Sequence, residues 1–137
     1  MKEWDNVEIL LVEDNLSDAE LTVRALRGIG VTQKILRLAD GVEALDFIFR
    51  QARFGDRDHA LPKLILLDLK MPRLDGIEFL QRLREDSATM NIAVALLTSY
   101  TREKIPIDAQ EFNVHDFLLK PVNPESLVAL VKFAGLL

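Results

Sequence analysis

Short apolar segments recur along the chain and alternate with stretches of helical periodicity. The apolar segments cover residues 7–12 (VEILLV), 34–39 (KILRLA), 64–67 (LILL), 92–97 (IAVALL) and 117–119 (FLL). Segment 64–67 has four consecutive apolar residues without alternation, which is typical of a strand buried on both faces of a parallel sheet. Segment 34–39 alternates in part, which favours a strand nearer the edge of the sheet.

Five helical patterns follow the five apolar segments. Ser17 and Glu20 have the spacing of a capping box, which predicts the start of the first helix. Asn123 followed by Pro124 predicts the start of the last one. Any helix around Pro106 is short, because proline does not fit inside a helix. The predicted helical segments are 17–30, 41–53, 75–85, part of 101–113, and 124–134.

Strands that alternate with helices predict an α/β fold. The strands should be parallel, with right-handed crossovers and with helices on both faces of the sheet. The chain ends one helix after the last strand, so we expect one domain over residues 1–137 without an effector domain.

Composition narrows the functional classes. The net charge is −5 and the basic residues are scattered, which disfavours a nucleic-acid surface. The chain contains no cysteine, which excludes disulfides and thiolate metal sites. No apolar run approaches the ~20 residues that span a bilayer, and no signal peptide is visible at the start. We therefore expect a cytoplasmic protein without a membrane partner.

Polar residues stand at the carboxyl ends of four of the five predicted strands. They are Glu13 and Asp14, Asp68, Thr98 with its neighbour Ser99, and Lys120. In a parallel sheet these ends lie at one edge, so the side chains are expected to share a pocket. Each alone has a structural explanation as a helix cap or a loop residue, but their joint occurrence favours a site.

Three carboxylates, a hydroxyl and an ammonium suit a phosphoryl group with a metal ion. Carboxylates this close repel each other unless a cation joins them, and Mg²⁺ prefers oxygen ligands. The absence of nearby His and Cys disfavours zinc and copper. Asp68 follows the middle strand and is the candidate phosphoryl acceptor.

The segments LLVEDN, LILLDLKMPRLDG, ALLTS and FLLKP, in this order and spacing, resemble the receiver domain of two-component response regulators. The resemblance covers residues 7–134. It implies a flavodoxin-like fold, a doubly wound five-stranded parallel sheet in the order 2-1-3-4-5. It also implies phosphorylation on aspartate by a partner sensor histidine kinase, with a signal passed to a downstream protein through the face formed by the fourth helix, fifth strand and fifth helix.

The resemblance assigns metal-binding roles to four residues. Asp68 is implied as the phosphoacceptor and as a Mg²⁺ ligand. Asp14 would bind Mg²⁺ directly, and Glu13 would act on it through water. The backbone carbonyl of Lys70 would complete the protein ligands.

It also assigns catalytic roles to Thr98 and Lys120 and switch roles to Thr98 and Phe117. Thr98 would bond a phosphoryl oxygen, and Lys120 would pair with the phosphoryl group. Phe117 matches the aromatic switch position, although a plain core aromatic is the alternative. The cation of Lys70, together with Tyr100, is expected to tune dephosphorylation.

A finer resemblance is to the stand-alone regulators paired with bacterial phytochromes. It rests on GVEALDF and the polar loop 51–62 that follows it. Such relatives often form homodimers, and the apolar C-terminal helix would suit an interface. Asn113-Val114 stands where a Gly-Ala pair is usual, and Asn tolerates the left-handed conformation.

Two other functions fit part of the pattern. A Mg²⁺-dependent phosphohydrolase with an aspartyl-phosphate needs a second acid two residues after the nucleophile, and Lys70 stands there. An interaction module of the same fold that is not phosphorylated would not need the complete set of acids, Thr98 and Lys120. We therefore expect a phosphoacceptor signalling protein rather than an enzyme.

Overall fold

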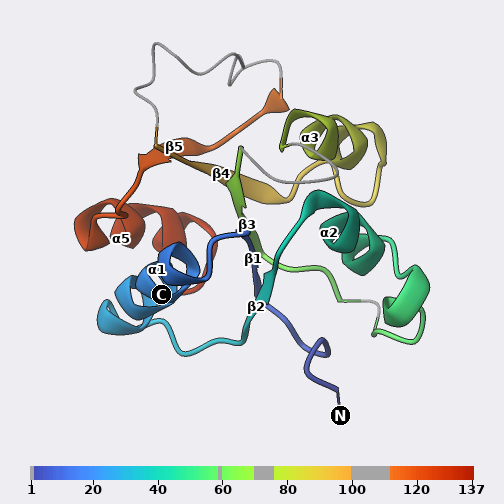
Figure 1. The fold of residues 1–137 in the computed structure, drawn as a ribbon, viewed down its shortest axis with the longest axis horizontal. Coiled ribbons are helices and arrows are strands. Elements are labelled where there is room, and N and C mark those ends of the chain that lie inside the picture. Colours follow the sequence, from blue (N-terminus) through green and yellow to red (C-terminus); the bar gives the residue numbers. More distant parts are fainter. Residues whose placement is uncertain (1, 59, 70–75, 100–111) are drawn as a thin grey trace.

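Five parallel strands form one sheet in the order β2-β1-β3-β4-β5, as Figure 1 shows. The computed structural model describes residues 2–58, 60–69, 76–99 and 112–137. The predicted α/β class and the flavodoxin-like strand order are both confirmed. The strands are β1 (Ile9–Val12), β2 (Ile35–Leu38), β3 (Leu64–Asp68), β4 (Ala93–Thr98) and β5 (Asp116–Leu119).

Burial follows the position of each strand in the sheet. Strands β1 and β3 are buried along their whole length, as expected for strands covered on both faces. Strand β2 alternates between half-buried and buried positions, and it is an edge strand, as its partly alternating sequence predicts.

Helices cover both faces of the sheet (Figure 1). The described helices are α1 (Leu16–Gly28), α2 (Gly41–Ile48), the short 3-10 helix η1 (Ala52–Phe54), α3 (Gly76–Glu85) and α5 (Pro124–Phe133). On β3, Leu64 and Leu66 join the apolar cluster beneath α1 and α5. Ile65 and Leu67 join the cluster beneath α2 and α3. An unbroken apolar strand thus supplies both layers of the core.

The first helix begins earlier than predicted. Its N-cap is Asn15, whose side chain accepts a hydrogen bond from the backbone N–H of Asp18 at 2.9 Å. Ser17 lies inside the first turn, so the prediction of a Ser17–Glu20 capping box is wrong. Asn is as good a cap as Ser, and the earlier start brings helix α1 closer to the end of β1.

The second helix is shorter than the predicted 41–53. It ends at Ile48, because Arg50 adopts a φ of 54° and Ala52 a φ of 52°, both in the left-handed region. The buried Arg57 guanidinium donates hydrogen bonds to the carbonyls of Phe47 at 2.7 Å and Ile48 at 3.0 Å. A side chain from the following loop therefore satisfies carbonyls at the end of the helix.

The remaining predictions concern the second half of the chain. Helix α5 has Asn123 as its N-cap and Pro124 in its first turn, as predicted. Asn113 adopts a φ of 55°, so the left-handed turn that Asn tolerates is present. The predicted short helix around Pro106 and the residue Tyr100 lie outside the described residues. Within the described ranges, the helices are too short or too polar to cross a membrane.

Candidate functional site

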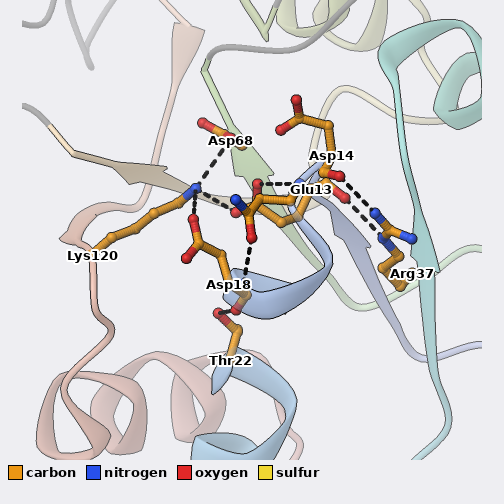
Figure 2. A network of polar contacts seen from close by, with 8 residues as sticks. Glu13, Asp14, Asp18, Thr22, Arg37, Asp68 and Lys120 are labelled. Atoms are coloured by element: carbon orange, nitrogen blue, oxygen red, sulfur yellow. Dashed lines mark hydrogen bonds and ion pairs between the residues drawn. The ribbon is translucent and has the colours of Figure 1, made fainter. Parts of the chain in front are cut away.

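A pocket of about 310 Å³ opens at the carboxyl ends of β1, β3, β4 and β5. The crossover topology brings these strand ends together, and Figure 2 shows the polar side chains that meet there. The sequence places Glu13, Asp14, Asp68, Thr98 and Lys120 at these ends, and all five line the pocket. The other lining residues are Asn15, Asp18, Leu69 and Ser99.

Three carboxylates form one cluster. Glu13, Asp14 and Asp68 each offer an oxygen, and these oxygens lie within 4.8 Å of one another. Asp14 is exposed, Asp68 is buried, and Glu13 is fully buried. Desolvation by burial raises the pKa of Glu13 to about 7; the Asp68 charge adds to the rise and the Lys120 hydrogen bond opposes it. Such a set of hard oxygen ligands suits a divalent cation of the Mg²⁺ type.

Lys120 stands among three carboxylates (Figure 2). Its Nζ forms an ion pair with Glu13 and hydrogen bonds with Asp68 Oδ2 at 3.1 Å and Asp18 Oδ2 at 3.2 Å. Burial alone would lower the pKa of Lys120, but the bond to Glu13 and the charge of Asp68 outweigh it and raise that pKa. The ammonium therefore stays charged and neutralises part of the carboxylate cluster.

The loop after β1 is fixed by contacts that sequence reasoning missed. Arg37, on β2, donates from Nε to the carbonyl of Glu13 at 2.8 Å and from Nη2 to the carbonyl of Asp14 at 2.9 Å. The backbone N–H of Asn15 donates to Glu13 Oε2 at 3.2 Å. These bonds hold the backbone of both acids, and they depend on the parallel pairing of β2 with β1.

Thr98 lies at the end of β4 and is buried. Its carbonyl accepts a hydrogen bond from the backbone N–H of Lys120 at 2.8 Å, which ties the ends of β4 and β5 together. Thr98 lines the same pocket as Asp68.

Phe117 and Lys70 are the two remaining predicted residues. Phe117, on β5, is half-buried, pairs in register with Leu96 and packs against the core beneath α2 and α3. Lys70, the predicted carbonyl ligand, lies outside the described residues.

The family model for the response regulator receiver domain matches residues 9–132. The chain belongs to this family. The match covers all five strands, and the family is one of signalling proteins rather than of enzymes. Membership implies a sensor kinase as partner.

Individual receiver proteins cover most of the chain. This chain is 38% identical to the "Probable methanogenesis regulatory protein FilR2" of Methanothrix harundinacea, over 90% of its own length and 78% of that protein. It is 32% identical to "Response regulator Rcp1" of Synechocystis sp., over 90% of this chain and 83% of Rcp1.

Solved structures agree with these relatives. The bacteriophytochrome response regulator AtBRR superposes with a TM-score of 0.84 and 35% identity, over 94% of this chain and 92% of AtBRR. The Mn(2+)-bound form of Rcp1 superposes with a TM-score of 0.74 and 32% identity, over 91% of this chain and 88% of that structure. The receiver family and the resemblance to phytochrome-associated regulators are thus confirmed, and phosphorylation-based signalling is the function of this receiver domain.

Proposed function

We propose that Asp68 is the phosphoacceptor of this receiver domain and takes its phosphoryl group from a sensor histidine kinase. The observation that carries the assignment is the position of Asp68 between Lys120, at 3.1 Å, and the carboxylates of Glu13 and Asp14. In the transfer, the P–N bond to the kinase histidine breaks and a P–O bond to Asp68 forms. An acceptor held beside a cation and a metal site needs little beyond positioning and charge neutralisation.

The metal that fits the carboxylate cluster is Mg²⁺, held by Asp14 and Asp68 directly and by Glu13 through water. The Mn(2+)-bound form of Rcp1 supports a divalent cation in this family. When bound, Mg²⁺ neutralises charge on the phosphoryl oxygens. The carbonyl of Lys70 is a further ligand by its place in the sequence, two residues after Asp68.

The remaining pocket residues receive the phosphoryl group and report its presence. The Lys120 ammonium pairs with one phosphoryl oxygen, and the Thr98 hydroxyl donates to another. Phe117 then changes its packing against the core when Thr98 moves. The altered face around β5 and α5 is the signal that a downstream protein binds.

Residues 1–137 act as one receiver domain. It works in the cytoplasm, because the sensor kinase takes its phosphoryl group from cytoplasmic ATP. The similarity to the bacteriophytochrome response regulator AtBRR supports a bacteriophytochrome as the sensor kinase. The exposed apolar side chains of Phe133 and Leu137 suit the interface of a homodimer. The domain takes phosphoryl groups from small donors and dephosphorylates itself, without acting on other substrates.

The test is intact mass after incubation with acetyl phosphate, with and without Mg²⁺. We expect one added phosphoryl group on the wild type, and none without Mg²⁺ or in Asp68→Asn. Asp46→Asn, which removes a carboxylate from α2, is the control and should gain the group normally. No adduct and no phosphate release would favour the unphosphorylated interaction module. Rapid turnover of unrelated phosphate esters would favour a phosphohydrolase.

A further inference from the structure

Lys120 already has a carboxylate partner for each of its three N–H groups. An ammonium has three donors, and Glu13, Asp18 and Asp68 match them one for one. A phosphoryl oxygen can take over the N–H that Asp68 itself holds. The phosphoryl group, however, brings three oxygens and more negative charge than the carboxylate, so a second N–H of Lys120 can serve it only if Glu13 or Asp18 gives up its place.

The three carboxylates differ in how readily they can leave. The side chain of Glu13 is 0% exposed and that of Asp68 is 10% exposed, whereas that of Asp18 is 39% exposed. Glu13 is also held by the backbone N–H of Asn15, and Asp68 carries the phosphoryl group itself. Moving a buried carboxylate off its cation leaves it without compensation, whereas a half-exposed one is rehydrated.

We propose that Asp18 is a positioning residue that occupies Lys120 in the unphosphorylated protein and is displaced from it when Asp68 carries a phosphoryl group. This inference rests on the proposed role of Asp68. Asp18 acts through Lys120 and needs no contact with the phosphoryl group. It competes with that group for the ammonium, and its own negative charge opposes the arriving oxygens.

The displacement also changes the surface beside the pocket. Asp18 and Lys120 line a small adjoining hollow together with Leu21 and Thr22 of α1 and the segment 121–122 after β5. Release of the carboxylate into water therefore alters α1 as well as the face around β5.

The experiment titrates beryllofluoride, a non-covalent phosphoryl mimic, into the Mg²⁺-loaded protein by calorimetry. An ion pair with one half-exposed partner is worth little, so we expect Asp18→Asn to bind beryllofluoride about two- to fivefold more tightly than the wild type. Asp18→Glu keeps the carboxylate and should return the affinity toward the wild-type value. Added salt should shrink the difference, because screening weakens the competition.

Glu20→Gln is the matched control, because Glu20 is an exposed acid on the same helix and does not line the pocket. It makes the same change of net charge and should leave the affinity unchanged. A gain in Glu20→Gln equal to that in Asp18→Asn would overturn the inference, as would an Asp18→Asn affinity equal to or weaker than wild type.

A structure of the beryllofluoride complex gives an independent readout. We expect Asp18 Oδ2 to lie beyond hydrogen-bond distance of Lys120 Nζ; retention of the 3.2 Å contact, with Glu13 displaced instead, would overturn the inference. The failure of the proposed function can be told apart from the failure of this inference. A wild type that binds no beryllofluoride and gains no phosphoryl group on Asp68 overturns the proposed function and this inference with it. A wild type that does both, with an Asp18→Asn variant that binds no more tightly, overturns this inference alone.

Discussion

Replacing Lys120 by methionine tests whether one ammonium holds the carboxylate cluster together. Methionine keeps an unbranched side chain of similar length and removes the charge together with its three N–H donors. The variant leaves Glu13, which is fully buried, facing Asp68 without the cation between them. In the absence of metal, the folded state should therefore lose stability.

The magnitude follows from the burial of the two partners. Removing one partner of a buried ion pair costs about 3–5 kcal/mol. Glu13 has an escape, because burial already raises its pKa to about 7, and it can bind a proton when Lys120 is gone. We therefore expect a loss of about 3 kcal/mol, the low end of that range, which lowers the Tm by about 10 °C for a domain of this size.

Mg²⁺ should reverse most of the loss. A ligand at 100 times its Kd stabilises the folded state by about 2.7 kcal/mol. Without Lys120 the carboxylates lose the cation that they share, so the increase in Tm on adding Mg²⁺ should be larger in Lys120→Met than in the wild type. Thermal unfolding followed by circular dichroism, with EDTA or with Mg²⁺, measures both effects.

Lys63→Met is the matched control for this experiment. Lys63 pairs with Glu8 at 3.2 Å, but 51% of its side chain is exposed, so its loss should cost less than about 1 kcal/mol. Equal destabilisation by the two substitutions would refute the reasoning, and so would a Lys120→Met variant that Mg²⁺ stabilises no more than the wild type.

Two further predictions concern the metal site and the backbone beneath it. Burial raises the pKa of Glu13 to about 7, so below that pH a proton competes with Mg²⁺ for its carboxylate. Mg²⁺ affinity, measured by calorimetry, should therefore rise from pH 5 to about pH 7 and level off above it. A Mg²⁺ affinity that stays constant between pH 5 and pH 7 would contradict the role of Glu13 in the metal site. A Cβ on Gly76 would lie 3.1 Å from Leu69 Cα and 3.2 Å from the Asp68 carbonyl oxygen. Gly76→Ala should therefore shift the end of β3. We expect it to lower the Tm and to slow phosphorylation by acetyl phosphate. Gly28→Ala meets no atom within 4 Å and should leave both unchanged or raise the Tm slightly; equal loss in the two variants would rule out this explanation.

The strands were predictable because their signal is local. Segment 64–67 is apolar at every position, and only a strand covered on both faces buries all four side chains, which is where β3 lies. The order of the strands came from the resemblance to receiver domains. The convergence of Asp68, Thr98 and Lys120 followed from the geometry of a parallel sheet, which places the ends of its strands at one edge.

Two helix boundaries were missed for different physical reasons. Asn15-Leu16-Ser17 holds two good capping residues two positions apart, and a motif alone does not decide which of them caps the helix. The end of α2 depends on left-handed turns at Arg50 and Ala52, where no glycine marks a break. The donors for its last carbonyls come from Arg57, a tertiary contact that periodicity does not reveal.

The difference between local sequence signals and tertiary contacts also explains which site residues were missed. The predicted pocket residues lie at the last position of a strand or directly after it, whereas Asp18 lies in the first turn of α1 and Arg37 lies within β2. In a doubly wound sheet the first turn of a helix borders the crevice as closely as the preceding strand end does, so its polar residues belong in any search for site residues. Arg37 reaches the loop only because β2 runs beside β1 with Arg37 opposite Leu11. A strand pairing of this kind is a property of the assembled fold. The contact of Asp18 with Lys120 and the contact of Arg37 with the loop after β1 can therefore be identified only in the three-dimensional structure.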